Sequence, residues 1–200
     1  MGVTFTPHVD KFETMKIRIL NGGHAIIAYP GGLLDIELVH DAMEQPVIRA
    51  FLDAVETREI LPILPPVPGQ NLGDYKNLII DRFSNPDVAD TVRRLCLDGS
   101  NRQPKFIVPS ILDNRAKGAV PDGLILASAM WCRYCAGTTD SGQVIEANDP
   151  SWERLQALAL KAKTDPLQWL TMDDIYGDVA RDERFRIAFS RCLTMLWRDG

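Results

Sequence analysis

The sequence predicts a mainly α-helical fold. Apolar side chains recur every three or four residues along most of the chain, which is the period of a helix with one buried face. No segment alternates apolar and polar residues as a half-buried strand does. Proline stands near the start of several periodic segments, where a helix tolerates it. These observations predict about eight helices and no Rossmann-type sheet.

The composition is that of one folded domain. The chain has 200 residues, of which 46% are hydrophobic and 24% charged, which is enough to bury a sizeable core. Its formal net charge of -5, without a basic cluster, argues against a nucleic-acid partner. The N-terminus lacks the pattern of a secretory signal, and no stretch is long and apolar enough to span a membrane. We therefore expect a cytoplasmic protein with no membrane partner.

The first half of the chain predicts helices separated by one clear break. Asp10 and Glu13 resemble a capping box, which predicts a helix from Asp10 to about Tyr29. A second helix is expected to end at Pro46, and a third to follow it directly. Four prolines and a glycine then interrupt the pattern in residues 61–71. Because this break is short and rich in apolar residues, we interpret it as an internal loop and not as a domain linker.

The second half is punctuated in the same way. Asn85 can cap a helix over residues 85–98, with Pro86 at its first position and Gly99 as its terminator. Further helical patterns occupy residues 103–118, 122–137, 149–163 and 182–200.

The four cysteines, Cys96, Cys132, Cys135 and Cys192, lie in apolar helical patterns. Cys132 and Cys135 form a C-x-x-C pair, which can supply two zinc ligands or a redox dithiol. No second pair of cysteines or histidines follows at a suitable spacing, so a four-ligand zinc site is incomplete. We expect buried thiols that pack in the core, and no metal.

Lys16, Asn21 and His24 stand in the otherwise apolar pattern of the first helix. On a helix that turns about 100° per residue, Asn21 lies roughly 140° and His24 roughly 80° around from Lys16, so all three can face one side. Gly22 and Gly23 between them lower helix propensity by about 1 kcal/mol each, which is reasonable if another group approaches the backbone closely.

These three residue types suit the interconversion of an alcohol and a ketone. An ammonium group beside apolar surface exchanges its proton near neutral pH, and an amide and an imidazole can bind an oxygen whose charge changes. Spacing alone favours the structural alternatives: a solvated lysine, an Asn-Gly turn and a core histidine. The chain contains no G-x-G-x-x-G, P-loop or G-x-S-x-G pattern, so it does not read as a complete cofactor enzyme.

Three blocks of the sequence, taken together, carry a family resemblance. They are KIRILNGGHAIIAYPG, RFSNPDVADTVRRLCLDGSNRQPKFIVPSI and IYGDVARDERFRIAFSRCLTMLW. The first resembles the Lys-x(4)-Asn-x(2)-His signature of the polyol-specific long-chain dehydrogenases, the mannitol dehydrogenase family, and the others resemble its later helical blocks. The resemblance implies the multi-helical C-terminal domain of such an enzyme, similar to the C-terminal domain of 6-phosphogluconate dehydrogenase.

The resemblance also implies a metal-independent NAD- or NADP-dependent oxidoreductase that acts on sugar alcohols like mannitol, sorbitol or arabinitol and on ketoses. Lys16 would be the general acid and base, Asn21 would hold the reacting oxygen, and His24 would orient the substrate. Arg94 matches a family arginine that binds substrate hydroxyls. Arg102 falls where family members carry lysine, and it keeps the positive charge in a larger, forked group.

Family members place the cofactor mainly in an N-terminal nucleotide-binding domain, which is absent from this sequence. Residues 1–10 resemble a remnant of the interdomain connection, and residues 11–200 resemble the all-helical substrate and catalytic domain. An N-terminal nucleotide-binding domain is therefore an expected partner. Two alternatives remain: a non-enzymatic helical interaction module that retains the family fold, and a uronate reductase of the fructuronate or tagaturonate type from the same family.

Overall fold

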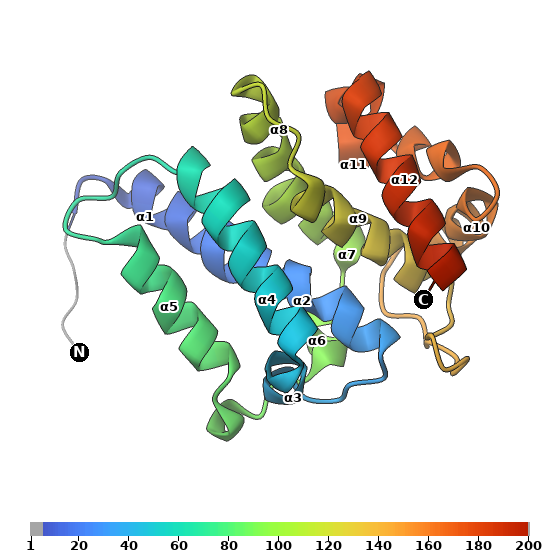
Figure 1. Cartoon of the computed structure of the whole chain (residues 1–200), viewed down its shortest axis with the longest axis horizontal. Helices are drawn as coiled ribbons and strands as arrows, with labels where there is room; N and C mark the ends of the chain where they lie inside the picture. Colours follow the sequence, from blue (N-terminus) through green and yellow to red (C-terminus); the bar gives the residue numbers. More distant parts are fainter. Residues whose placement is uncertain (1–5, 200) are drawn as a thin grey trace.

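The computed structural model describes residues 6–199 and is mainly helical, as predicted (Figure 1). The α-helices are α1 (Val9–Met15), α2 (Gly22–Leu33), α3 (Val39–Glu44), α4 (Pro46–Val55), α5 (Leu72–Phe83), α6 (Val92–Cys96), α7 (Gly99–Arg102), α8 (Val108–Ala116), α9 (Asp122–Cys135), α10 (Trp152–Ala162), α11 (Asp173–Tyr176) and α12 (Glu183–Asp199). The π-helical segments are η1 (Lys16–Asn21), η2 (Glu56–Ile60) and η5 (Gln103–Ile107). Short 3-10 turns are η3 (Leu61–Ile63), η4 (Pro86–Val88), η6 (Pro166–Thr171) and η7 (Gly177–Arg181). Extended pairing within the described residues is limited to two isolated bridges.

Helix α9 is the centre of the fold. It packs against α2, α10 and α12, and Figure 1 shows it between the N-terminal helices and the C-terminal group α10–α12. Its residue Trp131 is fully buried and meets Trp169 edge to face, with the ring centroids 4.8 Å apart. Cys132 and Cys135 lie on the same helix. All four cysteines are free and buried, which confirms their predicted role in packing.

The first helix is longer and less regular than predicted. It begins at Val9 without a side-chain cap, so Asp10 lies inside its first turn and the predicted capping box is wrong. It continues through Pro30 to Leu33 as α1, η1 and α2 in sequence. Residues 1–5 of the predicted interdomain connection lie outside the described residues.

The π-helical turn changes the angles between the polar residues of this helix. The N–H of Gly22 donates to the carbonyl of Ile17, five residues back, instead of four as in an α-helix. A five-residue separation then covers little more than one turn. Asn21 therefore lies closer to the face of Lys16 than the 140° of a regular α-helix predicts.

The sequence suggested a close approach at Gly22 and Gly23, and the structure shows it at Gly23 and not at Gly22. The segment η1 packs against η2 and η5. A Cβ built on Gly22 would lie 3.8 Å from Ile60 Cδ1, and one on Gly23 would lie 2.9 Å from Glu56 Oε1. The missing side chain of Gly23 thus lets Glu56 and Phe83 lie close to this helix.

Three other predictions are corrected by the backbone. The predicted second helix breaks after α2, where Asp35 has φ 58°, and only α3 remains of it. Residues 85–98 form two short pieces: Asn85 caps η4, and Thr91 caps α6 after Ala89 turns the chain at φ 47°. Gly99 begins α7 and does not terminate a helix.

Helix α5 was not predicted from the sequence. Its signal was Asn71, whose side chain accepts hydrogen bonds from the N–H groups of Gly73 and Asp74. The predicted helices at α9, α10 and α12 are confirmed. Within residues 6–199 no helix is long and apolar enough to cross a bilayer.

The two adjacent glycines give a matched pair of substitutions. Gly23→Ala would place Cβ 2.9 Å from Glu56 Oε1 and 3.1 Å from Phe83 Cε2, so the free energy of unfolding should fall by about 1–3 kcal/mol. At Gly22 the nearest atoms are 3.7 Å or more away, so Gly22→Ala should be neutral or stabilising by up to about 1 kcal/mol. Urea unfolding followed by circular dichroism measures both. Equal effects of the two substitutions would contradict the close approach at Gly23.

Candidate active site

A small pocket between α2, α5 and α6 contains the predicted residues His24 and Arg94. Its polar lining residues are His24, His40, Arg82, Asn85, Asp90 and Arg94. The pocket holds about 60 Å³, whereas sites for small molecules usually measure about 300 Å³ or more. A six-carbon sugar alcohol does not fit inside it. The described residues alone therefore do not enclose a ligand of that size at this pocket.

His24 is half-buried in this pocket and stacks on Phe83, with ring centroids 4.5 Å apart and planes inclined by 24°. Burial is the main cause that lowers the pKa of His24 to about 4, and the positive charge of Arg94 acts in the same direction. The imidazole is consequently neutral at pH 7. A neutral imidazole donates one hydrogen bond and accepts another, which suits contact with a hydroxyl group.

Arg94 is held in place by Asp90. Its Nε and Nη2 donate hydrogen bonds to the two carboxylate oxygens of Asp90, four residues earlier in the chain. This bond to Arg94 is the largest cause that lowers the pKa of Asp90. The Arg94 side chain is still 52% exposed, so its other N–H groups are accessible to a ligand. Asp90 was not predicted from the sequence. The signal that could have indicated it was its position four residues before Arg94, which is the spacing of an ion pair on one face of a helix.

Arg102 lies close to this pocket without lining it. Its Nη1 donates a 2.8 Å hydrogen bond to the backbone carbonyl of Leu95, which ties α7 to α6. Its positive charge also contributes to the lowered pKa of His24, after burial and Arg94. The structure thus brings Arg94 into the pocket with His24 and Arg102 within electrostatic range of His24.

Lys16 and Asn21 belong to η1, directly before the helix that carries His24, and they do not line the pocket. Asn21 is half-buried. Lys16 is exposed, and no described residue binds its ammonium group. The apolar surroundings expected for this lysine are therefore not supplied by residues 6–199.

Phe83 and Arg82 were also missed, because helix α5 was not predicted. Phe83 is buried at the end of α5, and its ring stacks on the ring of His24. No sequence motif marks it, since an aromatic residue at a helix end is usually part of a core. Its place beside His24 follows only from the packing of α5 on η1.

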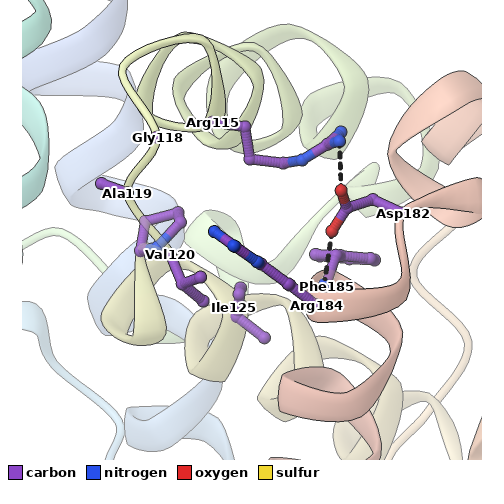
Figure 2. Close-up of a pocket in the computed structure, with 9 residues that line it drawn as sticks. Arg115, Gly118, Ala119, Val120, Ile125, Asp182, Arg184 and Phe185 are labelled. Atoms are coloured by element: carbon purple, nitrogen blue, oxygen red, sulfur yellow. Dashed lines mark hydrogen bonds and ion pairs between the residues drawn. The ribbon is translucent and has the colours of Figure 1, made fainter.

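A second pocket lies away from these residues, between α8, the 118–121 loop and the start of α12 (Figure 2). Figure 2 shows Arg115 directed at Asp182, with which it forms an ion pair, and Arg184 reaching across the pocket. Asp182 also accepts a 2.8 Å hydrogen bond from the N–H of Phe185. None of the predicted site residues lines this pocket. Its charged groups join α8 to the start of α12.

No cluster of three or more histidine, cysteine, aspartate or glutamate side chains that could hold a metal ion occurs in the described part of the chain.

Comparison with solved structures gives the class of fold. The chain superimposes on a mannitol 2-dehydrogenase from Pseudomonas fluorescens, solved as a ternary complex with NAD and D-mannitol, with a TM-score of 0.95 and 36% identity. The match covers 100% of this chain and 41% of that one. A D-sorbitol dehydrogenase, 23% identical, shares the fold with a TM-score of 0.90. The fold is that of a helical domain of polyol dehydrogenases.

Comparison with sequences gives the family. A family model described as the mannitol dehydrogenase C-terminal domain matches residues 8–197. A mannitol 2-dehydrogenase from Cereibacter sphaeroides is 62% identical over the whole chain, and one from Neosartorya fischeri is 38% identical over 193 residues. The chain belongs to the mannitol dehydrogenase family and corresponds to its C-terminal domain. It spans 42% of the Cereibacter protein and 38% of the Neosartorya protein.

The neutral state of His24 predicts its titration. Because its pKa in the folded chain, about 4, is below that of an unfolded histidine, the unfolded chain binds more protons between about pH 4 and 6.5. His24 should therefore contribute stability above about pH 6.5 that is lost as the pH falls towards 4. Nuclear magnetic resonance of the imidazole protons should show a midpoint near pH 4. A midpoint at pH 6 or above would contradict this burial.

Proposed function

We propose that the chain is the substrate-binding and proton-transfer domain of an NAD- or NADP-dependent polyol 2-dehydrogenase, which interconverts a mannitol-, sorbitol- or arabinitol-like sugar alcohol and a ketose. The observation that carries the proposal is the likeness, over the whole chain, to a mannitol 2-dehydrogenase that binds NAD and D-mannitol together. The neutral His24 beside Arg94 supports it, because this pair offers hydrogen bonds to hydroxyl groups.

The cofactor does not fit this chain alone. The sequence contains no glycine-rich loop for the phosphates of a dinucleotide. We assign the binding of the cofactor to an N-terminal nucleotide-binding domain, in the part of the relatives that this chain does not span. When bound, NAD or NADP would accept a hydride from the alcohol carbon or return it to the ketone carbon.

Lys16 is the proposed acid and base. In alcohol oxidation its neutral amine takes the hydroxyl proton at Nζ, and in ketone reduction its ammonium group returns the proton to the oxygen. Its exposure in this chain is compatible with that role, because a facing domain would cover it and remove its water. The proposal requires no metal ion.

Asn21 and His24 would hold the reacting oxygen and a neighbouring hydroxyl. The amide of Asn21 can donate to an oxygen as negative charge develops on it, and the π-helical turn brings it closer to the face of Lys16. His24 follows Asn21 by three residues, near enough to share a ligand. The accessible N–H groups of Arg94 would bind more distant hydroxyls, and Arg102 would add positive charge and keep α7 in place.

The proposal predicts that the 200-residue chain has little or no dehydrogenase activity by itself, because the cofactor domain is missing. Oxidation of mannitol, arabinitol and sorbitol with NAD and with NADP can be followed by nicotinamide absorbance. The same assay should give turnover when the chain is joined to an N-terminal nucleotide-binding domain from a relative. Robust turnover by the chain alone would contradict the proposal that a separate N-terminal domain binds the cofactor.

The role of Lys16 can be tested in the same joined protein. Lys16→Ala should lower the catalytic rate by roughly two to four orders of magnitude, as the loss of a general acid and base does. Lys11→Ala is the matched control, since it removes a lysine from the same helix and should leave the rate within about twofold. If Lys16→Ala keeps a rate within about threefold of the parent, Lys16 has no part in the proton transfer.

A further inference from the structure

Glu56 is a buried carboxyl group that the proposed chemistry does not use. It is the first residue of η2 and is 0% exposed. Neither of its carboxyl oxygens has a hydrogen-bond partner among the described residues. Burying a polar group without a hydrogen-bond partner costs free energy of folding. A buried group of this kind in a folded chain calls for a functional explanation.

The surroundings of Glu56 connect it to the candidate active site. Its Oε1 lies 2.9 Å from the place of a Cβ on Gly23, and Phe83 Cε2 lies 3.1 Å from the same point. Phe83 in turn stacks on His24, the residue that follows Gly23. Glu56 and Phe83 thus fill together the space that a side chain on Gly23 would take, directly beneath His24.

The charged groups around Glu56 do not neutralise it. Lys76, on α5, is the cation whose charge acts on the carboxyl, but its Nζ donates to Asp53 and to Thr57 Oγ1. Asp53, on α4, opposes ionisation of Glu56, and Tyr75 on α5 also interacts with it electrostatically. Burial raises the pKa of Glu56 to about 8. Its carboxyl group is therefore mostly uncharged at pH 7.

We propose that Glu56 is a positioning residue for His24: it packs against Gly23, fills together with Phe83 the space beside that glycine, and so keeps the phenyl ring stacked on the imidazole. Ionisation breaks this arrangement, because a carboxylate without a hydrogen-bond donor does not remain in this buried space. The carboxylate moves or admits water, Phe83 loses its support, and His24 shifts. The value of this for substrate binding rests on the proposed function, whereas the contact itself does not.

The test follows His24 in the 200-residue chain by nuclear magnetic resonance, without any activity assay. The chain has three histidines, so the carbon-bound imidazole protons are few and can be assigned with His8→Asn and His40→Asn. The Phe83 ring should shift the His24 signals upfield at pH 7. Because His24 has its own pKa near 4, a second change with a midpoint near pH 8 reports a neighbour and is expected to be Glu56.

Two variants decide the assignment. Glu56→Gln keeps the shape and lacks the titration, so it should keep the upfield shift and lose the change near pH 8. Glu59→Gln is the matched control: Glu59 lies on the same π-helical segment, but its carboxyl group accepts hydrogen bonds from the N–H groups of Gly123 and Leu124. This control should keep both signals.

Glu56→Ala removes the support and should weaken the upfield shift of His24 while the chain stays folded by circular dichroism. If Glu56→Ala does not fold, the comparison of the wild type with Glu56→Gln still tests the proposal. The proposal is overturned if the change near pH 8 is missing in the wild type, persists in Glu56→Gln, or disappears in Glu59→Gln. Since none of these outcomes depends on catalysis, a failed dehydrogenase assay leaves this result intact, and the reverse also holds.

Discussion

The close approach of Glu56 and Phe83 at Gly23 is the constraint on which the candidate site depends. Without a side chain at this position, Glu56 of η2 and Phe83 of α5 reach the space beside Gly23. That space is next to His24, so the same packing that builds the core also sets the plane of the imidazole ring. Core and site are therefore not separate parts of this domain.

The electrostatics of the site follow from this packing. Close contact removes water from His24 and from Glu56, and in each case loss of water favours the uncharged form. The charged groups stand at the edge of the pocket, where Arg94 and Asp90 neutralise each other and remain partly exposed. The buried part of the site is thus neutral, while its rim carries charge and can bind a polar ligand.

The sequence predicted the helical class and most long helices, because apolar periodicity alone decides these. It also suggested a close approach at Gly22 and Gly23, which the structure shows at Gly23 and not at Gly22. It could not predict the π-helical turn at η1, since no local propensity distinguishes an i→i+5 from an i→i+4 bond. Helix α5 was missed because its apolar face is narrow. Phe83, which lies at the end of this helix, was missed for the same reason. The roles of Lys16 and Asn21 stay predictions, because they depend on surroundings that residues 6–199 do not contain.

The π-helical turn at η1 holds one more residue than the α-helical turn that would otherwise stand there. In terms of register, it is a one-residue insertion that the fold has absorbed without breaking the helix. Everything after it, from Gly22 to Leu33, is rotated by about 100° relative to α1 compared with a regular helix. Deleting a single residue from the segment would restore regular geometry and rotate α1 relative to α2, which is held by its contacts with α4, α6 and α9. The site thus depends on the length of this segment as well as on its composition.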